Sequence, residues 1–382
     1  MKTLLILLLT AGVYPGFSQQ PADSTLDIRT LVSRHQYAEA LEKLAKRKED
    51  TFSIETFNLM GYCYSKQGMY REAVLSYQSA LKLDSLNQTT LSRLADLYKG
   101  KEEFIKAHTL YNRLSREDSL NSYFYKQSAY CLYKSGLLPF AIPLYEQANR
   151  LNPDDEEVVM ALAMIYFEQE EFNRCDSLLD RSLAGDTADT QLLSLKAKNK
   201  YYQKEYDSAF AALEAVFLLG DTSLSNIRLA GNALYALNEY DRSISWFERI
   251  PAELLEKDEY SQYMMGVSYR HLQRPEKSIA HLEKAIKLGI SDNISFYYQQ
   301  LGLSHEEKGE IDKALIAFET AGTYKEEGIL DYQIARIYDY YRDDPATALE
   351  YYKRYLDSRD SSVQRAWQFS RQRVKQLAGA GR

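Results

Sequence analysis

The sequence contains few of the residues that interrupt regular structure or cross-link a small fold. Its 382 residues include 8 prolines, 17 glycines and 3 cysteines. No stretch is rich in proline, glycine or serine, which argues against a flexible linker between globular domains. A chain of this length either divides into domains or builds one body by repetition, and the even composition favours repetition.

The three cysteines are too few and too far apart to form a disulfide framework. Their number is odd, so Cys63, Cys131 and Cys175 cannot all pair. Cys63 and Cys131 occupy equivalent places two repeats apart, whereas a disulfide bond needs Cα atoms within about 7 Å. We therefore expect three buried free thiols.

The strong sequence motifs of catalysis are also missing. The chain has no P-loop, no Gly-x-Gly-x-x-Gly after a strand, no Gly-x-Ser-x-Gly and no His-Glu-x-x-His. Its acidic pairs, such as Asp154-Asp155, fall at helix starts or turns. There they interact favourably with the positive end of the helix dipole or keep a loop hydrated. The histidines, which lack a metal-type spacing, are His35, His108, His271, His281 and His305. We expect no enzymatic activity, no cofactor and no metal.

The charge of the chain limits its partners. Its net charge is -7, and nucleic-acid binding depends on lysines and arginines that neutralise phosphates. Nucleic acid is therefore not an expected partner.

The first 18 residues have the three-part layout of a secretory signal. Lys2 precedes an apolar run that starts at Leu4, and small residues stand at Gly16 and Ser18, three and one before a cut after Ser18. The alternative, a membrane anchor, needs a longer apolar run to cross about 30 Å. No cysteine near the cut offers a site for lipid. We expect a periplasmic or extracellular protein without a transmembrane span.

A small residue recurs at a nearly constant interval. The separations between its members are 33, 34, 34, 34, 34, 34, 35, 36 and 33 residues. A fixed period of this length indicates stacked helical or other supersecondary units instead of one globular core. The members of this first column, the first of them degenerate, are Ile28, Gly61, Ala95, Ala129, Ala163, Ala197, Gly231, Gly266, Gly302 and Ala335.

Two further columns complete each unit. Small residues follow the first column by twelve positions, or thirteen in the last unit, and large apolar residues come four positions later on the same helix face. A turn with a capping glycine, clearest at Gly68 and Gly309, separates the first two columns. Each unit therefore reads as helix, tight turn and helix. The second column is Ala40, Ala73, Ala107, Ala141, Cys175, Ala209, Ser243, Ser278, Ala314 and Ala348, and the third is Leu44, Tyr77, Tyr111, Tyr145, Leu179, Leu213, Phe247, Leu282, Phe318 and Tyr352.

These residues resemble the tetratricopeptide repeat, whose period is 34 residues. The second unit carries the pattern in Phe57, Met60, Gly61, Tyr64, Gly68, Tyr70, Ala73, Tyr77 and Ala80, and the fourth adds the closing Pro153. The resemblance implies an all-α, right-handed superhelical solenoid of about ten helix-turn-helix repeats. Armadillo-like, HEAT-like and Sel1-type repeats fit the spacing less well, and a coiled coil would lack the regular turns.

The repeat pattern divides the chain into five segments. We expect a signal peptide at 1–18, a degenerate first repeat at 19–53 that keeps only its second helix convincingly, and regular repeats at 54–258. Further repeats with longer loops follow at 259–360, and a capping helix and tail occupy 361–382. Whether the repeats form one arc or two arcs hinged near 251–258 stays open.

The resemblance also implies a concave face built from the first helix of each unit. By position, its residues lie one, four and five places after the first column and three places before it. They are Tyr62, Lys66, Lys99, Lys126, Tyr130, Tyr133, Met164, Phe167, Lys198, Tyr201, Tyr202, Arg228, Asn232, Tyr235, Tyr263, Arg270, Tyr332, Arg336 and Tyr340. This face is aromatic and basic on an acidic chain.

The leading hypothesis is an exported scaffold that binds segments of partner proteins in this groove, in envelope assembly or secretion. Tyrosine offers large contact area, and arginine or lysine can engage carboxylates. In the alternative interpretation several tyrosines only pack between units. A second hypothesis is glycan or peptidoglycan binding through the same tyrosines. Arg228 with Asn232 resembles only half of the family's clamp for acidic peptides.

Overall fold

The computed structural model of the chain describes residues 24–47, 52–184, 189–289, 292–325, 327–358 and 363–380. All regular structure within these ranges is α-helical. The predicted signal peptide at 1–18 lies outside the described residues. No helix in the described ranges is long and apolar enough to cross a membrane.

The chain forms two compact units, Met1–Leu162 and Ala163–Arg382, and the division falls within helix α9. The N-terminal unit contains α1 (Ser24–Ser33), α2 (Tyr37–Ala45), α3 (Ile54–Lys66), α4 (Tyr70–Leu83), α5 (Gln88–Gly100), α6 (Phe104–Glu117), α7 (Ser122–Lys134), α8 (Leu138–Leu151) and the start of α9 (Glu156–Glu168).

The C-terminal unit continues with α10 (Phe172–Leu183), α11 (Thr190–Tyr202), α12 (Tyr206–Leu218), α13 (Leu224–Ala236), α14 (Tyr240–Phe247), α15 (Ala252–Leu255), α16 (Glu259–His271), α17 (Pro275–Leu288), α18 (Ile294–Lys308), α19 (Ile311–Tyr324), α20 (Gly328–Tyr340), α21 (Pro345–Asp357) and α22 (Gln364–Ala380).

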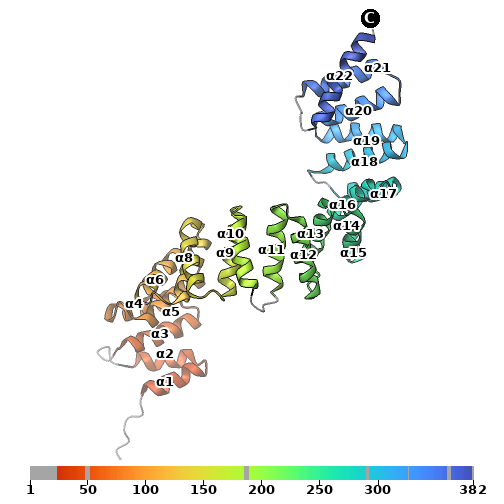
Figure 1. Cartoon of the computed structure of the whole chain (residues 1–382). Helices are drawn as coiled ribbons and strands as arrows, with labels where there is room; N and C mark the ends of the chain where they lie inside the picture. The colour runs from red at the N-terminus through yellow and green to blue at the C-terminus, as the bar shows by residue number, and fades with distance from the viewer. Residues whose placement is uncertain are drawn as a thin grey trace, which may run out of the picture. The chain divides into compact units, whose positions relative to one another are not determined.

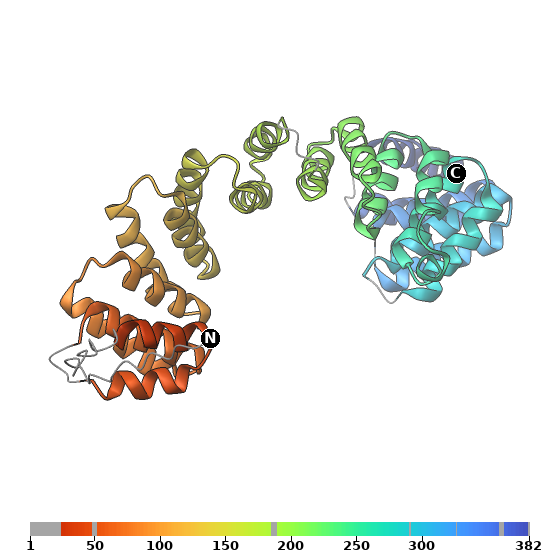
Figure 2. The ribbon, with the colours of Figure 1, turned by 90° about the horizontal axis from the view of Figure 1, so that it is seen from below.

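Consecutive helices pair into hairpins, and each hairpin packs against the next within its unit. Helix α3 contacts α4, α4 contacts α5, and the same alternation continues from α16 to α21. Figure 1 shows the hairpins α18–α19 and α20–α21 stacked one after the other, and Figure 2 shows the helices at the N-terminal end lying side by side. The fold is an all-α helical-repeat solenoid, as the sequence predicts.

The three columns meet where the two helices of a repeat cross. Every member of the second column is fully buried, and the third column is buried throughout. A Cβ atom on Gly61, Gly231 or Gly302 would lie 2.6 Å from the ring of the third-column residue of the same repeat. The small residues therefore allow the close approach of the paired helices, which confirms the packing expected from the sequence.

The turns between paired helices have a left-handed residue in every repeat, seven positions after the first column or eight in the last. Only three of these residues are glycine, although the left-handed region costs other residues about 1–2 kcal/mol. Lys204 is an example, with φ of 64°. The backbone N–H of Glu205 donates to the carbonyl of Lys200 at 2.9 Å, which closes the end of α11. This regular geometry holds the residue in the strained region.

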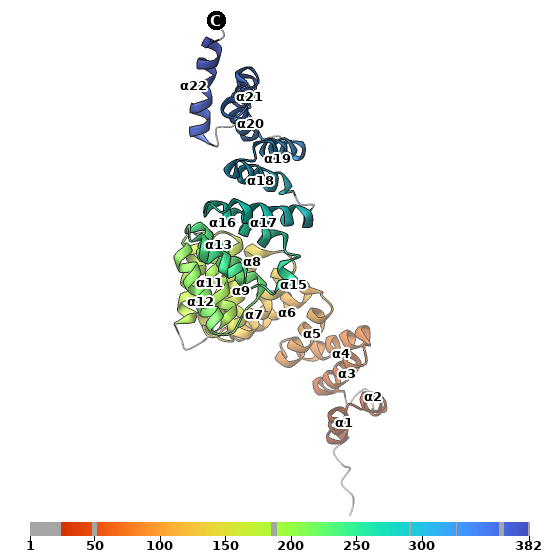
Figure 3. The ribbon, with the colours of Figure 1, turned by 90° about the vertical axis from the view of Figure 1, so that its right-hand side faces the viewer.

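The two ends of the repeat array differ slightly from the expectation. The first repeat keeps both helices, because Ile28 and Leu31 of α1 are buried in one cluster with Leu44 of α2. The C-terminal helix α22 spans Gln364–Ala380, within the predicted capping segment 361–382, and leaves almost no tail after it. Figure 3 shows α22 beside α21, and Phe369 packs edge to face on Tyr352. The capping helix is thus anchored through aromatic contacts.

The three cysteines are free and buried, as predicted. Burial raises the pKa of Cys63 and Cys131 to about 11 and that of Cys175 to about 12. Thiols with such pKa values remain protonated at neutral pH, so these residues act as small apolar side chains in the core.

Candidate partner-binding face

The candidate residues share one side of the first helix of each repeat. At 3.6 residues per turn, their positions fall within about 140° of the first column. The first-column residue contacts the second helix of its own repeat, so the candidate residues lie on the adjoining surface. We call this surface the first-helix face and describe it separately in each unit.

In the N-terminal unit the face is formed by α3, α5 and α7. The Tyr62 ring has the Nζ atom of Lys66 at 5.4 Å and the guanidinium of Arg93 at 5.8 Å from its centroid. Tyr130 and Tyr133 on α7 are both exposed. Aromatic and cationic side chains therefore alternate over this part of the face, in line with the sequence.

Two lysines of the N-terminal unit are already engaged with polar groups of their own chain. Lys126 donates to Asp155 at 2.8 Å and to Glu157 at 3.0 Å. Burial alone would lower the pKa of Lys126, but the two carboxylates outweigh it and raise the pKa. Lys99 donates to the Gln127 amide oxygen at 2.7 Å. The Asp96 carboxylate also lies 3.6 Å from the Lys99 ammonium. These lysines therefore connect one repeat to the next and contribute little free positive charge.

In the C-terminal unit one open part of the face lies on α9 and α11, and Tyr340 on α20 is as exposed as Tyr202. Met164 is 44% exposed and Tyr202 is 57% exposed. The rings of Phe167 and Tyr202 meet edge to face at 5.2 Å, and the Nζ atom of Lys198 lies 4.8 Å above the Phe167 ring. Tyr201 packs against Tyr202 at 6.0 Å. Phe167, Tyr202, Tyr201 and Lys198 are thus in contact, and Met164 precedes Phe167 by three residues on α9. We call these five residues the α9–α11 patch.

Lys198 differs from most other cations of the first-helix face. It is exposed, and among the described residues no carboxylate forms an ion pair with it. Its ammonium group instead makes a cation–π interaction with the Phe167 ring. The Lys198 ammonium group can therefore bind a carboxylate of a partner protein without breaking an existing ion pair.

Further along the face, α13 and α16 contribute Arg228, Asn232, Tyr235 and Tyr263. Arg228 pairs with the buried Asp258 at 2.6 Å and is not free for a partner. The Asn232 Oδ1 atom is buried and has no hydrogen-bond partner among the described residues. Buried polar atoms are normally satisfied, so this acceptor could receive a donor from a bound segment or from water.

Several tyrosines of the predicted face pack between repeats. Burial raises the pKa of Tyr201 and Tyr263 to about 12, and it also raises the pKa of Tyr235 and Tyr332. The Tyr332 ring lies 5.6 Å from that of the fully buried Tyr355. For these residues a packing role, one of the two interpretations drawn from the sequence, accounts for the geometry.

The face is less basic than the sequence analysis expected. Arg270 pairs with Glu307 at 3.1 Å, and Arg336 pairs with Glu306 at 2.8 Å. Both glutamates occupy first-helix positions themselves, four and five places after Gly302. The same positions also hold acidic side chains that the predicted aromatic and basic set leaves out, namely Asp96, Glu168, Glu306, Glu307 and Asp339.

Two other residues on or near the face were missed. Asn58 stands three places before Gly61, and its Oδ1 atom is buried without a hydrogen-bond partner in the described residues. Tyr260 on α16 is exposed, and its pKa is raised by burial and lowered by Asn232 and Arg228, with burial dominant. Asn58 occupies one of the positions that define the first-helix face, three places before the first column, so the sequence could have indicated it. Tyr260 occupies none of these positions.

The described residues contain no group of three or more His, Cys, Asp or Glu side chains arranged to hold a metal ion. His281, the most perturbed histidine, is held by Gln262 at 2.7 Å, and burial lowers its pKa to about 4. It is a neutral packing residue at physiological pH.

Comparison with known proteins agrees with the repeat pattern. Models of the tetratricopeptide repeat match residues 54–85, 132–198 and 260–288. No curated protein matches the sequence. The chain is thus a helical-repeat protein with a partly exposed aromatic face. It contains tetratricopeptide repeats at these three ranges.

Similar solved structures share the fold at low identity. The Cut9–Hcn1 hetero-tetramer of the APC/C is 14% identical over 93% of this chain and 83% of that chain, with a TM-score of 0.46. A tetratricopeptide-repeat protein from Parabacteroides merdae is 14% identical over 66% and 98%, with a TM-score of 0.43. YrrB, a TPR protein with an unusual peptide-binding site, is 16% identical over 49% and 94%, with a TM-score of 0.44.

The tetratricopeptide-repeat fold is consistent with a scaffold for protein–protein interaction.

Proposed function

We propose that this protein is an exported scaffold that binds a segment of a partner protein on the first-helix face, centred on the α9–α11 patch. The partner segment carries apolar side chains next to at least one carboxylate. The protein acts by holding this segment and not by catalysis, in envelope assembly or secretion.

The observation that carries the proposal is the exposure of the α9–α11 patch. Met164 and Tyr202 are among the more exposed large apolar side chains of the unit, and Phe167 lies between Tyr202 and Lys198. Contiguous exposed apolar surface with a polar rim is typical of interaction sites. Aromatic residues dominate the binding energy of such sites because they bury large areas at low entropic cost.

The electrostatics of the face support an acidic neighbour for the apolar side chains. Lys198 lacks an intramolecular carboxylate partner in the described part of the chain, whereas Lys126, Arg228, Arg270 and Arg336 each have one. In the C-terminal unit a partner carboxylate therefore gains most by approaching Lys198. In the N-terminal unit Lys66, whose Nζ atom lies near the Tyr62 ring, likewise has no ion pair among the described residues.

Binding is tested by Tyr202→Ala and Lys198→Glu, with Tyr324→Ala as the matched control. Tyr202 and Tyr324 are 57% and 58% exposed, and Tyr324 lies on a second helix away from the patch. Partners are identified by crosslinking in native cells and mass spectrometry, and the affinity of the purified partner is then measured. We expect each patch variant to weaken binding roughly tenfold or more, because a lost hot-spot residue costs about 2 kcal/mol.

The control variant should bind the partner as the parent protein does. Equal affinity of Tyr202→Ala, Lys198→Glu and the parent would remove the patch from the binding site. Salt should weaken binding of the parent more than that of Lys198→Glu, since screening acts on the charge pair.

Export is supported by the layout of residues 1–18. We expect the mature protein to begin at Gln19 and to be recovered from the periplasm or the medium. Intact-mass measurement of the protein from native cells decides the point, and retention of Met1 would refute export by this signal.

A further inference from the structure

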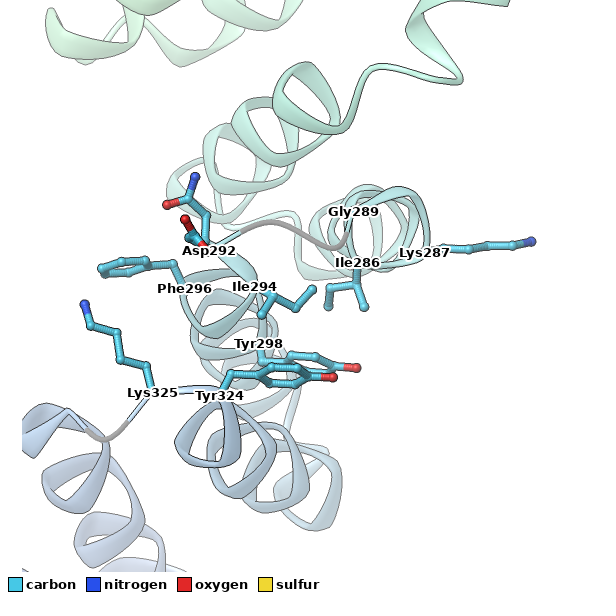
Figure 4. Close-up of a pocket in the computed structure, with 10 residues that line it drawn as sticks. Ile286, Lys287, Gly289, Asp292, Ile294, Phe296, Tyr298, Tyr324 and Lys325 are labelled. Atoms are coloured by element: carbon cyan, nitrogen blue, oxygen red, sulfur yellow. The ribbon is translucent and has the colours of Figure 1, made fainter.

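A hollow of about 850 Å³ opens where α17, α18 and α19 meet in the C-terminal unit (Figure 4). It lies at the connection between the eighth and ninth repeats, where the first-column spacing is longest at 36 residues. Its volume falls within the range of about 300–1,000 Å³ that is typical of small-molecule sites. The hollow is separate from the positions that define the first-helix face.

Aromatic rings form two walls of the hollow. Tyr298 and Tyr324 stack with their centroids 5.8 Å apart and their planes 11° from parallel. Tyr324 is 58% exposed, so this ring is not sealed by its neighbour. Phe296, also exposed, stands on the opposite side of the hollow in Figure 4. Buried Ile294 lies between these walls.

The polar groups of the hollow offer both hydrogen-bond donors and acceptors. The Asp292 carboxylate is exposed at the start of α18, and the tyrosine hydroxyls can donate or accept. The Lys325 ammonium lies 5.2 Å above the Phe296 ring. Lys287 also lines the hollow, and Lys325 already forms an ion pair with Glu327 at 2.6 Å. Two basic groups are therefore balanced by two acidic ones, Asp292 and Glu327.

We propose that this hollow binds a short neutral oligosaccharide. A sugar ring has a flat C–H face that stacks on an exposed aromatic ring, and hydroxyls that both donate and accept. Tyr324 and Phe296 provide the ring faces, while Asp292 and Lys325 provide an acceptor and a donor for the hydroxyls. The two walls can hold neighbouring sugar rings.

An apolar peptide side chain fits the same hollow less well. Such a side chain would displace water from Asp292 and Lys325 without replacing its hydrogen bonds, which costs free energy. The helical walls also expose no strand edge with which a peptide backbone could pair. Sugar hydroxyls satisfy both polar groups.

The test measures binding of the full-length protein to a panel of neutral trisaccharides. Chitotriose, cellotriose, maltotriose, mannotriose and galactotriose are titrated by calorimetry and by saturation-transfer NMR. We expect at least one to bind with a dissociation constant of about 1 mM or tighter. Tyr324→Ala and Phe296→Ala should each weaken that binding roughly tenfold.

Tyr202→Ala on the α9–α11 patch is the matched control and should bind the sugar as the parent does. Lys325→Gln retains a donor and should lose less affinity than Tyr324→Ala. Thermal melts of all variants confirm that they fold. The proposal is overturned if no trisaccharide binds, if Tyr324→Ala and Phe296→Ala bind like the parent, or if Tyr202→Ala abolishes binding. The last outcome would assign the sugar to the first-helix face instead.

Discussion

Replacement of Asp258 by alanine is expected to lower the free energy of unfolding by about 3 kcal/mol. Asp258 is the N-cap of α16, and its side chain is 4% exposed. Its carboxylate accepts hydrogen bonds from Arg228 at 2.6 Å and from the Ser261 backbone N–H at 3.2 Å. The alanine variant removes the helix cap and leaves the Arg228 guanidinium without its partner. Because Arg228 is 35% exposed, it can regain some water, which places the loss at the lower end for a buried pair.

The same residue should make stability depend on pH. Burial would raise the pKa of Asp258, but hydrogen bonds from Arg228 and Ser261 outweigh burial, and the pKa lies below its usual value. The unfolded carboxyl titrates near pH 3.9. The contribution of Asp258 is therefore complete above about pH 4 and is lost as the pH falls through the folded-state pKa. The stability gap between the parent and Asp258→Asn should narrow below about pH 4.

Urea denaturation of the parent, Asp258→Ala and Asp258→Asn over a range of pH measures both effects. Asp241→Ala is the matched control, because Asp241 is paired with Arg274 at 3.0 Å but both side chains are exposed. An exposed pair contributes less than about 1 kcal/mol. A loss for Asp258→Ala no larger than that of Asp241→Ala would contradict the role of the buried pair.

Replacement of Gly231 by leucine is expected to cost about 3 kcal/mol and to loosen the hairpin α13–α14. A Cβ atom at Gly231 would lie 2.6 Å from the Phe247 ring, and the Ser243 hydroxyl donates to the Gly231 carbonyl at 2.8 Å. Overpacking of a closed site costs about 1–3 kcal/mol, and leucine adds three more carbons than the first clash requires. Hydrogen exchange should report lost protection in these two helices before the rest of the unit.

A matched substitution separates the clash from any effect on helix propensity. Gly100 ends α5, and a Cβ atom added there would have no neighbouring atom within 4 Å, so Gly100→Leu should leave stability nearly unchanged. The pair Gly231→Ala with Phe247→Leu should be less costly than the sum of its two single changes, because Ala197 and Leu213 occupy these columns in the preceding repeat. If the stability losses of the two single variants simply add in the double variant, the Phe247 ring is not what opposes a side chain at position 231.

The repeat pattern in the sequence was sufficient to place nearly all helices. The columns predicted which glycine is a close contact, since Gly231 belongs to the first column and Gly100 does not. The left-handed turns were predicted only at glycine, yet residues such as Lys204 adopt the same conformation. The reason is that the paired helices fix the turn geometry, and this tertiary constraint overrides the local preference.

The candidate site was predicted less completely than the fold. Spacing indicated which side of each first helix forms the proposed face, and that side includes the exposed Met164 and Tyr202 and the partly buried Phe167. It did not indicate that Arg228 is neutralised by Asp258, because the acid comes from the insertion before α16, 30 residues away. Ion pairing of this kind depends on side chains from different repeats meeting in space.

The sequence by itself determined the repeat, its columns, the buried thiols and the helix face on which partners are proposed to bind, because these follow from a local period. Only the tertiary structure decided which cations of that face are already paired, which tyrosines are buried and where an irregular connection leaves a hollow beside Tyr324. Those properties arise from the packing of one repeat on the next, and the period of a single chain does not encode which distant side chains will touch.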